Sequence, residues 1–67
     1  MSKAGRIANK IHKAYASRII SAPEAIRKLE AVDAYYVLSE AQSIKLSDLT
    51  YHYTTNRHMF DEKGFRV

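Results

Sequence analysis

The side chains best suited to acid–base or metal chemistry are too scattered along this sequence to form a site on one element. Its three histidines stand at positions 12, 52 and 58. No two of them are three or four residues apart, the spacing that places two ligands on one helix face. His58 and Glu62 have that spacing, but a single such pair is typical of a surface contact. We therefore expect no metal site and no cofactor.

The hydroxyl and carboxylate groups do not suggest a catalytic site either. The serines lie at expected helix ends or in loops, where capping of backbone amides explains them. Asp33 and Glu40 stand seven residues apart in an apolar stretch, and Arg18 interrupts an earlier apolar face. Because a buried charge needs a partner, we expect Arg18 to pair with one of these two acids. With no nucleophile–base pair and no phosphate-binding loop, the chain is expected not to be an enzyme.

The most informative charge pattern is a run of cations near the N-terminus. Residues 1–20 carry a net charge of +5 and no acid, whereas residues 21–48 carry −2 and residues 49–67 carry +1. At about 100° per residue, a set of these cations shares one helical stripe: Lys3, Arg6, Lys10 and Lys13. Such a stripe can follow a phosphate backbone, so it predicts nucleic-acid binding. The alternatives are a solvated face, an acidic protein partner or a membrane surface, the last disfavoured by an apolar side that is largely alanine.

The stripe requires a helix over residues 3–20. Apolar residues recur there at positions 4, 7, 8, 11, 14 and 15, which is the pattern of one helix face. Ser21 and Glu24 then match a capping box, and Pro23 fits a first helical turn, so a second helix is expected over 22–41. The second half of that helix is apolar on all sides, which predicts that it lies at the centre of the domain or in a dimer interface.

The last third of the chain admits two interpretations. Ser47 and Asp48 suit a helix start and Gly64 suits a helix end, which together favour a third helix over 47–62. Against this, residues 49–55 are rich in strand formers, and residues 61–64 could form a hairpin turn. We predict an all-α domain of three helices. The alternative is an α+β fold in which two helices precede a C-terminal β-hairpin.

A second group of residues suits the binding of a protein. Tyrosine and arginine are enriched at interaction hot spots. The sequence offers such a surface through Tyr35, Tyr36, Leu38, Tyr51, Arg57 and His58. The C-terminal part of this group could instead belong to a helix-turn-helix, with Asn56 and Arg57 reading base edges. That arrangement is disfavoured because no glycine is present for the tight turn.

Length and composition set the limits of these interpretations. A chain of 67 residues has room for one domain, over residues 1–67, with a thin core. Without cysteine it has no disulfide or thiolate metal site, so a homodimer is as consistent with the sequence as a monomer. No apolar run is long enough to span a membrane, and no signal-peptide pattern is present, so we expect a cytoplasmic protein.

These observations favour a non-enzymatic regulatory or accessory protein. Its expected partner is nucleic acid, bound through the basic N-terminal helix. The alternative is an inhibitor or adaptor module that acts on a larger protein complex through a tyrosine-rich helical surface. That alternative includes an acidic protein as partner.

Overall fold

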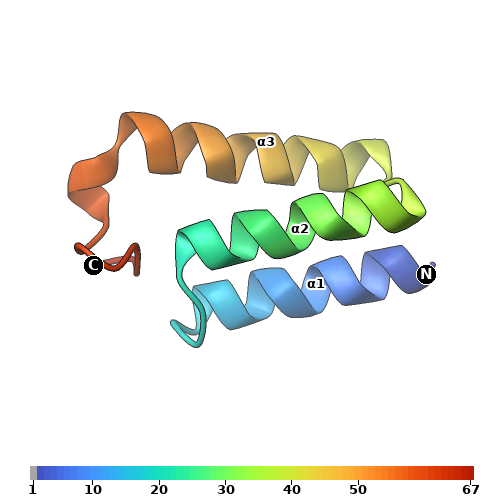
Figure 1. Cartoon of the computed structure of the whole chain (residues 1–67), viewed down its shortest axis with the longest axis horizontal. Helices are drawn as coiled ribbons and strands as arrows, with labels where there is room; N and C mark the ends of the chain where they lie inside the picture. Colours follow the sequence, from blue (N-terminus) through green and yellow to red (C-terminus); the bar gives the residue numbers. More distant parts are fainter. Residues whose placement is uncertain (1) are drawn as a thin grey trace.

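Three α-helices form the protein, as the helical patterns predict. The computed structural model describes residues 2–67. Within them α1 spans Lys3–Ala16, α2 spans Ala22–Tyr36 and α3 spans Glu40–Thr55, followed by a 3₁₀ turn, η1, at Arg57–Met59. Successive helices run antiparallel, and the C-terminal segment returns toward the start of α2 (Figure 1). The all-α fold is confirmed, and none of the helices in the described residues is both long and apolar enough to cross a membrane.

A serine precedes each of the three helices. In each case the hydroxyl oxygen accepts a hydrogen bond from the amide three residues further on, at 3.1–3.3 Å. This satisfies one of the backbone N–H groups that a helix start leaves unpaired. The three capping residues are Ser2, Ser21 and Ser39. The cap predicted at Ser21 is confirmed, but the one predicted at Ser47 is wrong, because that residue lies inside α3.

The break between the second and third helices comes earlier than predicted. α2 ends at Tyr36 rather than at residue 41, because Val37 adopts a left-handed backbone with a φ of 61°. The Asp33 carboxylate accepts a hydrogen bond from the Leu38 amide at 2.9 Å, which holds the turn. No glycine or proline marks this break, so the apolar pattern of the sequence does not indicate where the helix ends.

The early end of α2 also changes which of its faces are buried. Ala25, Leu29 and Val32 form one buried stripe, but Tyr35 and Tyr36 are exposed. This stretch is therefore not enclosed at the centre of the domain, and its alternative placement in a dimer interface is still a prediction. Its apolar residues divide between a core face and a surface patch.

α3 confirms a third helix, but the bounds predicted for it, 47–62, are wrong, because it begins at Glu40 and ends at Thr55. Its run of strand formers is helical, and threonine hydroxyls within it donate hydrogen bonds to carbonyls one turn earlier, at 2.6–2.9 Å. The donors are Thr50, Thr54 and Thr55. Beyond α3, Phe60 and Arg66 form one isolated antiparallel bridge. No strand occurs in residues 2–67, so the β-hairpin alternative is not supported.

The core is thin and consists largely of small side chains. Leu29 is the largest residue that is fully buried. Alanines between α1 and α2 let the two helices approach closely, but each buries little apolar area. Half-buried tyrosine and phenylalanine side chains cover this core from the α3 side and the C-terminal segment. The buried hydrophobic residues are Ala4, Ala8, Ile11, Ala22, Ala25, Leu29, Val32, Leu38 and Leu49.

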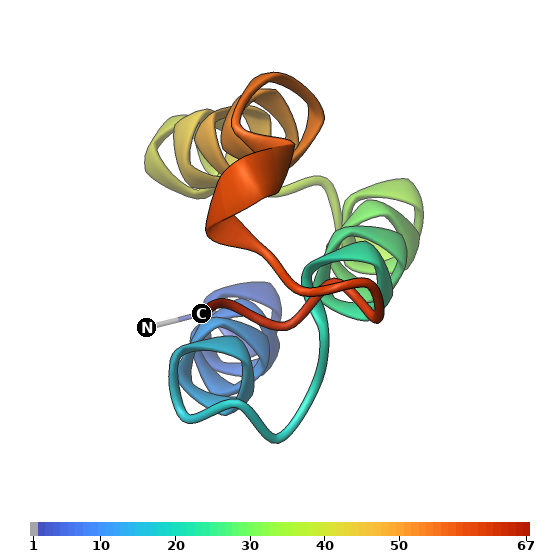
Figure 2. The same cartoon turned by 90° about the vertical axis from the view of Figure 1, so that its left-hand side faces the viewer.

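The C-terminal segment closes one end of the helical bundle. The first amide of α2 donates a hydrogen bond to the Gly64 carbonyl at 2.9 Å, and the Arg18 guanidinium donates two to the Arg66 carbonyl. Figure 2 shows the segment passing between α3 and the other two helices. The expected pairing of Arg18 with Asp33 or Glu40 is wrong. Arg18 lies beyond the end of α1, and within residues 2–67 no ion pair joins it to either acid.

Candidate functional site

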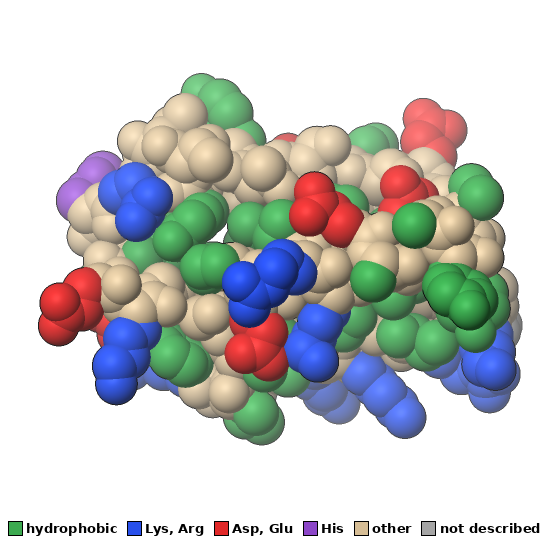
Figure 3. Space-filling view, viewed as in Figure 1, with side chains coloured by type: hydrophobic (Ala, Val, Ile, Leu, Met, Phe, Trp, Pro, Cys, Tyr) green, Lys and Arg blue, Asp and Glu red, His purple; other side chains and the backbone are tan. Residues whose placement is uncertain are grey.

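The cations of the predicted stripe all lie on the solvent side of α1. Lys3, Arg6, Lys10 and Lys13 are exposed, and among residues 2–67 none of them forms an ion pair with a carboxylate. Lys and Arg side chains project along the lower edge of the molecule, over α1 (Figure 3). Three of the four also line a shallow depression together with Ile7. The structure therefore keeps the stripe as one open surface, which we call the basic face.

Helix stability does not explain the cation at the first position of α1. Lys3 is the first residue of α1, and the first turn contains no acidic residue. A cation at a helix N-terminus meets the positive end of the helix dipole and costs about 0.3–1 kcal/mol. The basic face thus begins at a position where a cation is unfavourable for the helix itself.

Tyr36 lies beside the start of the basic face, and Tyr35 contacts Tyr36. α2 runs antiparallel to α1, so its last turn meets the first turn of α1 (Figure 1). The Lys3 Nζ atom lies 5.9 Å from the centroid of the Tyr36 ring. The Tyr35 and Tyr36 rings are 5.8 Å apart and tilted by 44°, and they are 85% and 42% exposed. We call these two side chains the tyrosine pair.

The other residues predicted to bind a protein do not join the tyrosine pair. Leu38 is only 6% exposed and belongs to the core, so it is not a surface residue. Tyr51, Arg57 and His58 are exposed, but they lie toward the far end of α3 and in η1 (Figure 1). The Arg57 guanidinium stacks 4.5 Å from the centroid of the Tyr53 ring. The five exposed residues of this group therefore form two separate surfaces.

The helix-turn-helix interpretation is also wrong. α2 and α3 lie alongside each other in antiparallel directions, whereas that motif crosses its two helices at about 90–120° (Figure 1). Asn56 follows the last residue of α3, and Arg57 belongs to η1. Neither residue lies on the exposed face of a reading helix.

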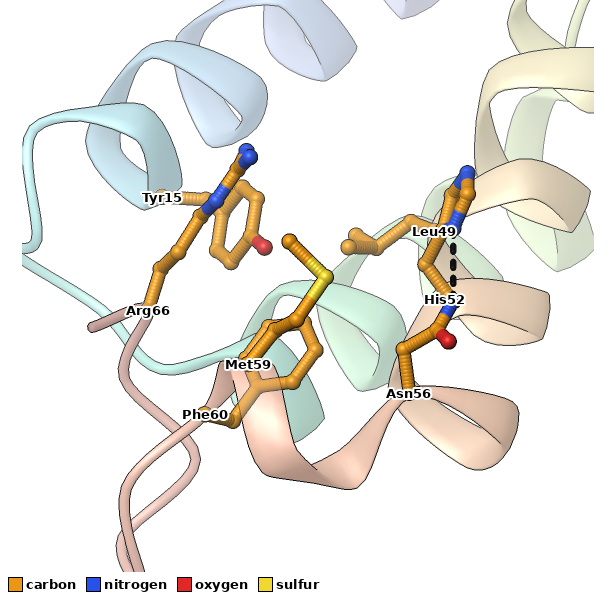
Figure 4. A pocket seen from close by; sticks show the side chains of 7 residues that line it. All are labelled: Tyr15, Leu49, His52, Asn56, Met59, Phe60 and Arg66. Carbon is orange, nitrogen blue, oxygen red and sulfur yellow. Dashed lines mark hydrogen bonds between the residues drawn. The ribbon is translucent and has the colours of Figure 1, made fainter.

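A cavity at the other end of the molecule was not predicted from the sequence. It has a volume of about 320 Å³ and lies between the end of α1, the end of α3 and the C-terminal segment (Figure 4). Its described lining includes no serine, cysteine or carboxylate side chain. Three segments build it, which is why no local spacing indicated it. The lining residues are Tyr15, Leu49, His52, Asn56, Met59, Phe60 and Arg66.

Titratable groups near this cavity are perturbed mainly by burial. Burial raises the pKa of Tyr15, and the nearby Arg66 charge opposes that rise. In Figure 4 the Arg66 guanidinium lies beside the Tyr15 ring. The His52 Nδ1 atom lies 3.3 Å from the side-chain amide nitrogen (Nδ2) of Asn56, one turn further along at the end of α3.

Polar side chains also occupy the seam between α1 and α3. The Gln42 amide donates a hydrogen bond to Asn9 Oδ1 at 2.9 Å. His12 Nε2 and Gln42 Oε1 are buried without a hydrogen-bond partner among residues 2–67. Burial, followed by the charge of Lys45, lowers the pKa of His12. The seam is therefore a weakly satisfied polar contact rather than an apolar one.

Neither metal-binding geometry nor similarity to known proteins assigns a role to this chain. Within residues 2–67 no group of three or more histidine, cysteine, aspartate or glutamate side chains is arranged to hold a metal ion. Comparisons with protein-family models, curated proteins and solved structures find no match for the chain.

Proposed function

We propose that this chain is a non-enzymatic accessory protein that binds nucleic acid through the basic face. The observation that carries the proposal is the alignment of four exposed cations on one side of α1, none of which forms an ion pair with a carboxylate in the described part of the chain. From Lys3 to Lys13 the helix rises about 15 Å. Along the axis of a duplex, where each strand carries one phosphate per about 3.4 Å, that length spans about four phosphates. The cations therefore extend over a short run of phosphates.

Salt dependence provides the direct test. If each cation neutralises one phosphate, log K falls with log salt concentration with a slope of up to about −3.6 on duplex and about −2.8 on single strands. We expect the variant with Lys3, Arg6, Lys10 and Lys13 all changed to alanine to lose most of the affinity and most of the slope. Alanine favours helix, so α1 should persist, and far-UV circular dichroism checks this.

A second variant controls for net charge. It changes four other exposed cations to alanine, so both variants lower the formal net charge from +4 to 0. The control set is Arg27, Lys28, Lys45 and Lys63. Equal losses in the two variants, or unchanged binding by the first, would reject the basic face as the binding surface. The stoichiometry of the same titration tests the homodimer, which is still a prediction.

The alternative proposal is a module that binds an acidic protein. It is supported by the exposed tyrosine pair and the neighbouring Val37, which is 78% exposed. An acidic polypeptide such as polyglutamate is a suitable probe. If it competes for the chain as strongly as a nucleic acid of equal charge, the protein-binding alternative is favoured over the first proposal.

A further inference from the structure

We infer that the nucleic acid bound by this surface is single-stranded, with its phosphates on the basic face and an unpaired base on the tyrosine pair. The inference rests on the proposed function and specifies its ligand. Lys3 is the point where the two parts meet, because its Nζ atom belongs to the basic face and lies 5.9 Å from the Tyr36 ring. A strand that follows the cations toward the start of α1 therefore reaches an aromatic surface.

The exposure of Tyr35 is the first feature that favours a single-stranded ligand. This side chain is 85% exposed, so it contributes almost nothing to the core. Its ring contacts Tyr36 at a tilt of 44° rather than in a parallel stack, which leaves ring surface open to a ligand. An aromatic ring beside cations is the combination with which proteins hold single strands without sequence preference.

The strained end of α2 is the second feature that favours a single-stranded ligand. Val37 stops the helix directly after the tyrosine pair and does so in a left-handed conformation, with a φ of 61°. A β-branched residue strongly disfavours that conformation. Strain of this kind collects at functional sites. Here it leaves Tyr35 and Tyr36 on a terminal turn at the corner of the molecule.

The apolar floor of the basic face is the third feature that favours a single-stranded ligand. Ile7 lies among Lys3, Arg6 and Lys10 in the shallow depression on α1. At the right-hand end of Figure 3, hydrophobic side chains meet the Lys and Arg side chains of the lower edge. Such a surface suits a strand that presents both phosphates and base faces. A duplex keeps its base faces stacked inside, so the tyrosine pair would gain nothing from it.

The test compares labelled oligonucleotides with equal numbers of phosphates by fluorescence anisotropy. The probes are oligo(dT), oligo(rU), an abasic strand and a hairpin duplex. We expect the wild-type chain to bind the first two more tightly than the last two. Changing Tyr35 and Tyr36 together to alanine should weaken oligo(dT) binding by about 5- to 150-fold, the range of one stacked base. Duplex affinity and the salt slope should stay unchanged.

Two further variants separate stacking from general effects. Tyr35→Phe keeps the ring and should retain oligo(dT) binding. Tyr51→Ala removes a tyrosine that is 63% exposed on α3 and should have no effect. If duplex and single strand bind equally and the double tyrosine variant behaves as wild type, the inference is wrong although the proposed function stands. If no nucleic acid binds in a salt-dependent manner, both are wrong.

Discussion

Gly64 lies so close to Pro23 that a β carbon built on the glycine would be 2.5 Å from the Pro23 Cδ atom. Gly64 also has a φ of 89°, a conformation that side-chain-bearing residues rarely adopt. Its carbonyl accepts the hydrogen bond from the first amide of α2. This contact therefore joins the C-terminal segment to the start of the second helix.

Gly64→Ala should be strongly destabilising. Left-handed backbone costs about 1–2 kcal/mol for a residue with a β carbon, and the clash adds about 1–3 kcal/mol. We expect urea denaturation to show that the free energy of unfolding falls by about 2–5 kcal/mol, the sum of these two costs. Adding Pro23→Ala to Gly64→Ala should recover the part due to the clash. A Gly64→Ala chain as stable as the exposed-site control Lys63→Ala would contradict this account.

Arg18 occupies the position after the C-cap of α1 where glycine is usual. Its φ is 64°, and the Ile19 amide donates to the Ala14 carbonyl at 2.9 Å, as in a Schellman motif. Arg18→Gly and Arg18→Ala both lose the contact with the Arg66 carbonyl, but only glycine relieves the backbone. We expect the Arg18→Ala variant to be less stable than the Arg18→Gly variant by about 1 kcal/mol.

Amide hydrogen exchange provides a second measurement on the same two variants. Both should exchange faster at the amides of Asp61 and Val67, whose hydrogen bonds hold the C-terminal segment together. Unchanged exchange there would mean that the Arg18 side chain does not anchor the segment.

Val37→Gly should stabilise the chain. The valine side chain is exposed, so little packing is lost, while relief of the left-handed strain of about 1–2 kcal/mol outweighs the flexibility that glycine adds to the unfolded chain. Val37→Ala removes the same exposed methyl groups but keeps the β carbon, and is the matched control. We expect a melting temperature higher for glycine than for alanine. The reverse order would show that Val37 is not strained.

His12 should make stability depend on pH. Because burial lowers its pKa below 6.5, the unfolded chain binds a proton more readily than the folded one. The free energy of unfolding should therefore fall as the pH decreases through the region just below 6.5 and level off once the folded imidazole is also protonated.

A histidine replacement series measures this effect. His12→Gln should flatten the pH dependence of urea denaturation between about pH 7 and 5.5, whereas His58→Gln, at an exposed position, should leave it in place. An equal response of the two variants would assign the pH dependence to a group other than His12.

Local sequence was sufficient wherever one residue or one helical face decides the outcome. The helical periodicity of α1, the cap at Ser21 and the exposure of the four cations follow from side-chain spacing and from hydroxyl-to-amide hydrogen bonding, which act within one or two turns. The all-α class follows from the same patterns.

Tertiary structure decided the features that join distant segments. The end of α2 at Tyr36 depends on a strained Val37 that no turn residue signals. The threonine-rich stretch in α3 is helical against its strand propensity, with Leu49 in the core and Tyr53 packed against it. The meeting of Lys3 with Tyr36 arises only because antiparallel packing brings the two helix ends together. Spacing along a chain describes neighbours on one helix, and it carries no information about which other helix will lie beside it.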